Sequence, residues 1–224
     1  MFQLMTNIKQ VSALIKKEFL IEWRTRYALN GILLYVISTI FLAYLSFVDL
    51  EPSVWNGVFW IIMLFAITNA VAKSFINESA RRKMYYFFIV ASWQLLLSKI
   101  IYNLFLGLLI GFISFSAYAL VLGLPAMITL NFSVALFLGV LSFSILFTII
   151  SAIASQNQTN SAGLMAVLGF PIVIPMLLIL IKLSNKLLTG DFLIDLWRDI
   201  AVLIALNVLV AVISFILFPF IWKD

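Results

Sequence analysis

The sequence predicts an all-α integral membrane protein with six transmembrane helices, on the basis of its composition, its apolar segments and its charge distribution. Of its 224 residues, 65% are hydrophobic and only 10% are charged, whereas soluble domains carry about 25% charged residues. Six apolar segments approach the length of about 20 residues that crosses a bilayer. They lie at about residues 29–48, 57–72, 100–122, 132–154, 163–181 and 200–222. The second segment is the shortest and is expected to use its flanks.

The cationic residues predict the orientation of these spans. Eleven of the fourteen Lys and Arg residues lie in the N-terminal segment, the connection between the second and third spans, or the C-terminus. Only Lys182, Lys186 and Arg198 lie on the opposite side. Cytoplasmic loops collect Lys and Arg, so both termini are predicted to be cytoplasmic. The net charge of +5 therefore reflects the accumulation of Lys and Arg on the cytoplasmic side of a membrane protein and does not indicate nucleic-acid binding.

Residues 1–28 predict an amphipathic helix on the cytoplasmic membrane surface, followed by a membrane domain over 29–224. Lysines interrupt the apolar residues, unlike the continuous apolar stretch of a cleavable signal. The apolar residues recur at helical spacing: Leu4, Ile8, Val11, Ile15, Phe19 and Trp23. Such a helix lies in the interface plane, and the alternative is an ordinary solvated helix.

The residues that are missing exclude several functions. None of the six predicted spans contains Asp, Glu, Lys or Arg, although proton-coupled carriers usually place a carboxylate at mid-membrane. The chain has no Cys and no His, which excludes disulfides, Cys/His zinc sites and imidazole bases. It also has no phosphate-binding loop of the GxxxxGK[ST] type. We therefore expect no catalytic residues, no metal and no directly bound cofactor, so that energy for any work must come from a partner.

The connection between the second and third spans carries the densest charge cluster of the chain. It reads INESARRKMYYFFIV over 76–90, with Arg81, Arg82 and Lys83 directly before an aromatic run. A short helix along the inner surface accommodates both parts, with cations at headgroups or a protein and aromatics at the interface. Two interpretations remain open: a positively charged anchor that turns back into the membrane, or a docking helix for a soluble motor.

Two patterns within the spans predict local structure. Pro171 and Pro175 are four residues apart on one helix face, and each removes a backbone donor. Their span is expected to bend or break, either as a moving part or as a static kink. Gly107 and Gly111 form a GxxxG motif, which allows close helix packing either within the chain or at a dimer face.

The segment 182–199 is predicted to lie on the external side. It carries three cations and three carboxylates, with Leu193, Leu196 and Trp197 on an apolar side. It is either a short re-entrant or surface helix that contacts a partner, or a solvated loop.

Three stretches of the sequence resemble the CcmB family, the permease subunit of the cytochrome c maturation ABC transporter, also called haem exporter protein B. They are KKEFLIEWRTRYALNGILLYVIST (16–39), NESARRKMYYFFIVASWQLLLSKIIYN (77–103) and GFPIVIPMLLI (169–179). The third stretch resembles the double-proline pattern of the family and is the most specific. The resemblance extends over nearly the whole chain.

This resemblance implies a multi-pass protein of the bacterial inner membrane that works with partners. The implied partners are a soluble ABC ATPase that binds ATP, a second copy of the chain, a haem-handling membrane protein and a periplasmic haem chaperone. Haem is the implied cargo. The resemblance also implies a coupling helix that contacts the ATPase, with residues of the other internal loop as a second contact. The expected coupling residues are Glu78, Ser79, Arg81, Arg82, Lys83, Tyr85, Tyr86, Gln156 and Asn157.

Two other functions fit the same residues. The chain is alternatively the permease of another ABC exporter, for a lipid, drug or peptide. It is also compatible with a non-transporting membrane scaffold that only anchors partners. The identity of the proteins that bind it would separate these alternatives.

Overall fold

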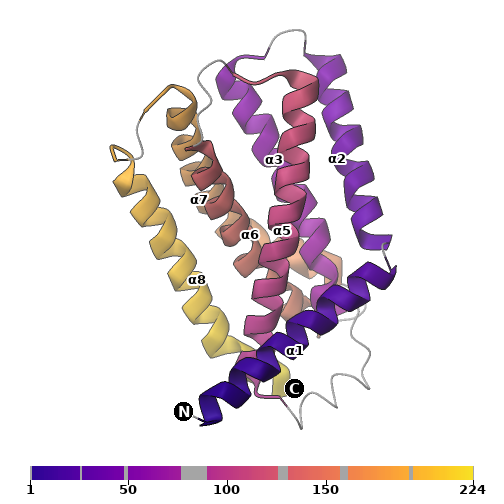
Figure 1. Cartoon of the computed structure of the whole chain (residues 1–224). Coiled ribbons are helices and arrows are strands. Elements are labelled where there is room, and N and C mark those ends of the chain that lie inside the picture. Colours follow the sequence, from indigo (N-terminus) through magenta and orange to yellow (C-terminus); the bar gives the residue numbers. More distant parts are fainter. Residues whose placement is uncertain are drawn as a thin grey trace.

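The computed structural model describes residues 2–25, 27–47, 50–76, 90–125, 131–156, 161–191 and 194–223. Regular secondary structure in these ranges is helical. The helices are α1 (Phe2–Thr25), α2 (Tyr27–Ser46), α3 (Pro52–Ile76), α5 (Ser92–Leu122), α6 (Phe132–Ala154), α7 (Ser161–Leu188) and α8 (Trp197–Lys223). Helices α2, α3, α5, α6, α7 and α8 form a bundle, and α1 crosses one end of this bundle obliquely (Figure 1). Both termini lie near that end, which is called the α1 end below.

Helix α6 forms the centre of the bundle. It packs against α3, α5, α7 and α8, and 78% of its most apolar stretch is buried, compared with 22% for α8. Small residues such as Gly139, Ser142 and Ser144 let the neighbouring helices approach it closely. Helix α8 instead exposes most of its apolar surface.

Aromatic side chains hold together the end of the bundle opposite α1. Trp55 and Phe59 of α3 pack against Tyr118 of α5 and Phe132 of α6, with ring centroids between 4.8 and 6.0 Å apart. The Tyr118 hydroxyl donates to the backbone oxygen of Trp55 at 3.0 Å. The buried polar atom of this tyrosine is thereby satisfied, as a low-dielectric interior requires.

A tryptophan packs against a glycine where α3, α6 and α7 meet. The Trp60 ring lies against Gly139, where a Cβ atom would overlap the ring. Trp60 Nε1 donates to Ser184 Oγ of α7 at 2.8 Å. Gly139 therefore provides the space that a large, fully buried indole needs at the helix contact.

Five helices are long and apolar enough to cross a membrane: α3, α5, α6, α7 and α8. In α2, the apolar part Asn30–Ser46 is shorter and would extend about 26 Å, less than a hydrocarbon core of about 30 Å. The all-helical membrane class is thus confirmed, whereas the sixth span stays a prediction. The N-terminal segment forms helix α1, and its location on a membrane surface also stays a prediction.

Three helices extend beyond their predicted boundaries. Helix α5 begins at Ser92 rather than near residue 100, because the stretch 92–99 is apolar enough to join the buried bundle. Helix α7 continues to Leu188 and α8 begins at Trp197. Residues 182–188 and 197–199 of the predicted external segment therefore belong to α7 and α8, whereas residues 189–191 and 194–196 lie between these helices without helical structure.

We expect Gly139→Ala to destabilise the bundle, because the new methyl group would displace the Trp60 ring from its contact with α6. Overpacking of this kind costs about 1–3 kcal/mol. Thermal unfolding of the purified protein in mild detergent should show a lower midpoint. Gly57→Ala is the matched control, since nothing lies within 4 Å of a Cβ atom at that position. Equal midpoints for the two variants would contradict the proposed packing.

Candidate functional site: a buried polar cluster at the α1 end

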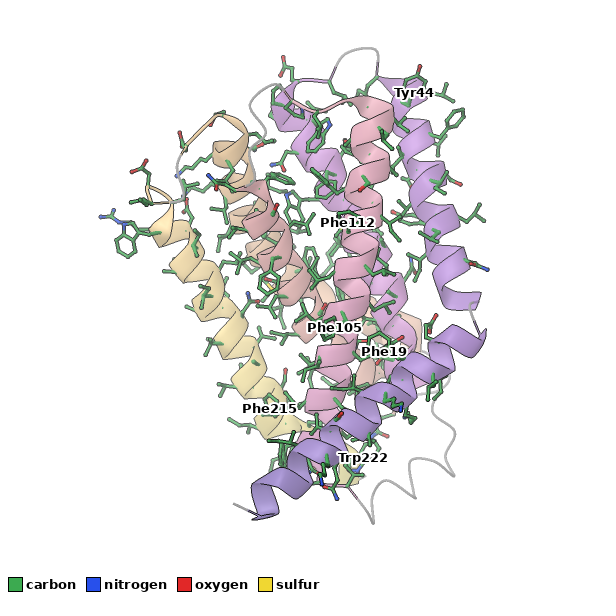
Figure 2. The ribbon with its side chains drawn as sticks, viewed as in Figure 1. Phe19, Tyr44, Phe105, Phe112, Phe215 and Trp222 are labelled. Atoms are coloured by element: carbon green, nitrogen blue, oxygen red, sulfur yellow. The ribbon has the colours of Figure 1, made fainter. Side chains whose placement is uncertain are left out.

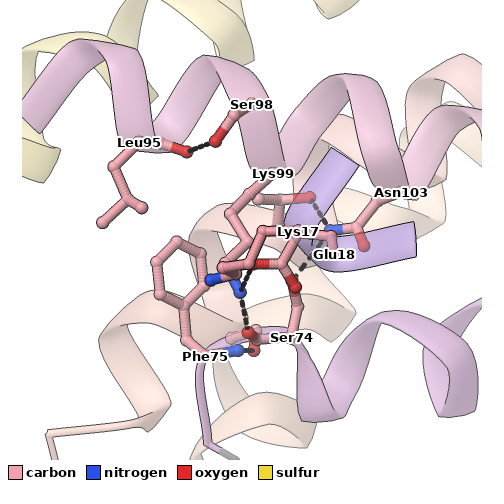
Figure 3. Close-up of polar contacts among 10 residues, drawn as sticks. Lys17, Glu18, Ser74, Phe75, Leu95, Ser98, Lys99 and Asn103 are labelled. Atoms are coloured by element: carbon pink, nitrogen blue, oxygen red, sulfur yellow. Dashed lines mark hydrogen bonds and ion pairs between the residues drawn. The ribbon is translucent and has the colours of Figure 1, made fainter. Parts of the chain in front are cut away.

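A cluster of polar side chains joins four helices at the α1 end of the bundle. Figure 3 shows several of its members and the contacts between them. The cluster comprises Glu18 of α1, Ser74 of α3, Lys99 and Asn103 of α5, and Thr148 and Ser151 of α6. Segment 77–89 follows α3 directly, so this cluster lies at the base of the predicted coupling segment.

Lys99 is the central charge of the polar cluster. Its side chain is only 1% exposed, and a buried ammonium is costly unless it is paired. Its Nζ atom lies 3.1 Å from Glu18 Oε1, donates to the backbone oxygen of Ser74 at 2.5 Å and lies 5.1 Å from the centre of the Phe75 ring. An anion, a carbonyl dipole and an aromatic face therefore surround this charge.

The bond to Ser74 stabilises the last turn of α3. The last four carbonyl groups of a helix have no partner within the helix, and the helix dipole is negative there. A lysine ammonium satisfies one of these groups and complements the dipole. Lys99 therefore stabilises the C-terminal end of α3.

Hydrogen bonds from α5 and α6 hold the same turn of α3. Asn103 Nδ2 donates to Thr148 Oγ1 at 2.8 Å and to Ser74 Oγ at 3.3 Å. Ser151 Oγ donates to the backbone oxygen of Ala72 at 2.9 Å and accepts from the backbone N–H of Phe75 at 3.4 Å. These bonds connect the end of α3 to α5 and α6.

Helix α1 is attached to the bundle through the same cluster. Lys17 Nζ also lies 2.6 Å from Glu18 Oε1. One residue further along, Phe19 packs edge-on against Tyr102 of α5 at 5.2 Å and lies near Phe105, where α1 crosses α5 (Figure 2). Both ionic and aromatic contacts therefore fix α1 across the start of α5.

Most of the predicted coupling residues lie outside the described residues. This holds for Glu78, Ser79, Arg81, Arg82, Lys83, Tyr85, Tyr86 and Asn157. Gln156 is described: it is exposed, and its side-chain amide donates to the backbone oxygen of Ile221 in α8. Gln156, which follows α6, thus contacts the C-terminal helix α8.

The predicted glycine motif faces α6. A Cβ atom at Gly107 would lie 2.8 Å from a methyl group of Val140, and one at Gly111 would lie 3.4 Å from the other Val140 methyl group. These contacts favour packing within the chain over a dimer face.

The two prolines do not interrupt their helix, since α7 continues through Pro171 and Pro175. A gating role for these two residues stays a prediction.

Sequence reasoning did not identify the roles of Lys99 and Glu18. The charge distribution places Lys99 among the cations of the cytoplasmic connection between the second and third spans, yet it lies inside α5 and is buried. A signal was available, because the stretch LLLSKIIYN places a single lysine between apolar residues of helical pattern. Such a lysine requires a buried anion, but its partner is distant in the sequence.

A second group of charges lies at the opposite end. Lys182 and Lys186 of α7 donate to the two oxygens of Asp199 at 2.8 and 3.0 Å, and Arg198 lies over the Trp197 ring at 5.5 Å. Exposed ion pairs of this kind contribute little to stability.

Among the described residues, no group of three or more His, Cys, Asp or Glu side chains gathers at a possible metal site.

Comparison with known families decides what kind of protein carries this cluster. A family model described as CcmB protein matches residues 9–221, nearly the whole chain. The chain belongs to the CcmB family. Nothing matches it in the comparisons with curated proteins and with solved structures.

Membership in the CcmB family gives the general role of the protein. CcmB proteins are permease components of haem-export ABC transporters in cytochrome c maturation, and they are not themselves enzymes. Together with its apolar helices, this membership makes the chain a multi-pass protein of the inner membrane.

We expect Glu18→Gln to weaken the polar cluster strongly, because Lys99 would lose the carboxylate that lies 3.1 Å from its ammonium group. Removing one partner of a buried ion pair costs roughly 3 kcal/mol. Thermal unfolding in detergent should therefore show a much lower midpoint than for Glu51→Gln, which removes an exposed carboxylate at the opposite end. Adding Lys99→Met to Glu18→Gln should recover part of the loss, since an apolar side chain needs no anion. A wild-type midpoint for Glu18→Gln would contradict this role.

Proposed function

We propose that this chain is the membrane subunit through which a separate ABC ATPase drives cytochrome c biogenesis. ATP binding and hydrolysis on the partner are coupled either to haem export or to release of the haem-loaded periplasmic chaperone. The observation that carries this proposal is the polar cluster at the base of segment 77–89, in a chain of the CcmB family.

The cluster has the properties that a coupling element requires. A soluble motor can transmit its motion only through a segment whose ends are rigidly attached to the membrane helices. Ser74 and Phe75 precede the segment, Lys99 and Asn103 follow it, and hydrogen bonds join the two sides. A push on segment 77–89 is therefore transmitted to α3, α5 and α6 together, and through Glu18 to α1.

We place the ATPase contact on the coupling helix expected from the sequence. In this arrangement Arg81, Arg82 and Lys83 offer charge contacts to an acidic groove or to lipid headgroups, and the aromatic run anchors the helix. Gln156 and Asn157 provide the second contact. The bond from Gln156 to Ile221 supports this, since it links the second internal loop to α8.

The membrane topology and the partners of the complex follow from this assignment. Both termini and segment 77–89 face the cytoplasm, six spans cross the membrane, and α1 lies along its inner surface. The partners are the ATPase, a second copy of the chain, a haem-handling membrane protein and the periplasmic chaperone. Haem is cargo of the complex rather than a resident cofactor, because a chain without His and Cys offers no common axial ligand of those types.

We expect the triple variant Glu78→Ala, Arg82→Ala and Tyr86→Ala to stop coupling while leaving the protein in the membrane. Cytochrome c maturation should fall about ten-fold, within the range of a lost coupling free energy between two sites. In reconstituted membranes, ATP turnover by the partner should continue without the dependent release step.

The control for this variant removes the same kinds of side chain elsewhere. The triple variant Lys16→Ala, Tyr44→Ala and Glu51→Ala changes one cation, one tyrosine and one carboxylate, all exposed and outside segment 77–89. It should mature cytochrome c normally. Normal maturation in the Glu78, Arg82 and Tyr86 variant as well would refute the coupling helix.

Two further functions predict different partners for the purified protein. A permease of another exporter would co-purify an ATPase without haem-maturation proteins, and a scaffold would co-purify no ATPase. Extraction of the tagged chain in mild detergent, followed by identification of the bound proteins, separates both from the proposed function.

A further inference from the structure

An open hollow of about 610 Å³ lies where α7 ends and α8 begins, at the end of the bundle opposite α1. Its lining includes the cations Lys182 and Lys186 of α7 and Arg198 of α8, and the carboxylates Asp195 and Asp199. Because three of these five side chains are cationic and two are anionic, the hollow carries one net positive charge. An anion is therefore the kind of ligand that it attracts.

The cations of this hollow keep most of their hydrogen-bond donors. The Nζ atoms of Lys182 and Lys186 each donate to one oxygen of Asp199, at 2.8 and 3.0 Å, and an ammonium group has three donors. Among the described residues Arg198 pairs with no carboxylate, and its guanidinium lies 5.5 Å from the centre of the Trp197 ring. The hollow therefore offers more donors than its own carboxylates occupy.

The position of the hollow along the helices is the level expected for lipid headgroups. The predicted spans end at residue 181 and resume at residue 200, so that Lys182 and Arg198 lie directly outside the hydrocarbon core. Trp197 is exposed beside them, and tryptophan accumulates at membrane–water interfaces. In the proposed topology these cations lie among the phosphate groups of the external leaflet.

Exposed apolar side chains continue from the hollow towards the middle of the membrane. Leu178 lies one turn before Lys182 on α7, and Val202 lies one turn after Arg198 on α8. Both apolar residues are exposed, and residues four apart lie on the same helix face. A lipid whose headgroup occupies the hollow therefore has an apolar surface for its acyl chains on each helix.

We propose that this hollow binds the phosphate group of an anionic phospholipid such as phosphatidylglycerol. Arg198 holds two phosphate oxygens through its planar guanidinium, which matches phosphate geometry. Lys182 and Lys186 supply further donors from the other helix. The site lies at the opposite end from the polar cluster and does not depend on the proposed function.

A lipid fits the hollow better than a free phosphate ion, because apolar side chains adjoin the cations. Ile194 and Trp197 line the hollow and are both exposed. A free ion leaves these side chains in water, whereas the glycerol backbone and first methylene groups of a lipid cover them. Burial of apolar surface then adds to the charge contacts.

A fluorescent label at the hollow tests the site in the full chain. The chain has no Cys, so Ile194→Cys provides a single thiol for an environment-sensitive fluorophore. In detergent micelles, dioleoyl-phosphatidylglycerol should give a saturable spectral shift at about five-fold lower lipid fraction than dioleoyl-phosphatidylcholine, since one charge near the membrane surface has about this effect. Leu124→Cys is the matched control, because Leu124 is exposed at the same end but outside the hollow. It should show no saturable shift.

The role of Arg198 is tested in the Ile194→Cys background. Arg198→Gln should raise the half-saturating fraction of phosphatidylglycerol about five-fold, whereas Arg198→Lys keeps the charge and should raise it less. Without added lipid, Arg198→Gln should unfold at the same temperature as the parent, because no carboxylate among the described residues loses its partner. This measurement separates loss of the site from loss of the fold.

Several outcomes would overturn this inference. Equal half-saturation by phosphatidylglycerol and phosphatidylcholine, or an unchanged response in Arg198→Gln, would show that the cations select no anion. The same shift with inorganic phosphate alone would assign the hollow to a free ion, and a saturable shift at Leu124→Cys would indicate unspecific lipid uptake. A photoreactive label on Ile194→Cys that captures an acidic protein in native membranes would assign the hollow to that protein instead.

Discussion

The burial of the Lys99 charge is the constraint on which the α1 end of the molecule depends. An ammonium group with 1% of its side chain exposed must be surrounded by opposite charge or by dipoles, since the free energy of leaving it bare is prohibitive. Glu18, the Ser74 carbonyl and the Phe75 ring meet this requirement from two other helices. As a result, this charge links α1, α3 and α5 to one another.

The rest of the bundle is held together by close packing and short hydrogen bonds. Lipid tails are as apolar as leucine, so helices in a bilayer associate through contact and polar links rather than through exclusion of water. Helix α6 is suited to this, because Gly139 admits the Trp60 ring and Thr148 and Ser151 bond to neighbouring helices. The aromatic group around Trp55 performs the same task at the opposite end.

The two ends of the bundle therefore differ in a way that suits an energy-receiving subunit. The α1 end carries a charged, hydrogen-bonded cluster that spans four helices and adjoins segment 77–89. The opposite end is fixed by aromatic packing, with exposed ion pairs at Asp199. At the α1 end, hydrogen bonds from Lys99 and Asn103 of α5 hold the end of α3.

The sequence by itself determined the membrane class, the helical segments and the family. Span 132–154 coincides with α6, and span 29–48 nearly coincides with α2, because bilayer thickness and hydropathy act over about 20 consecutive residues. The tertiary structure alone decided that Lys99 is buried, that Gly107 and Gly111 face α6, and that both prolines of α7 point outward. These features depend on which helices become neighbours. Glu18 and Lys99 are far apart in the chain, and only the folded bundle brings the carboxylate to the ammonium.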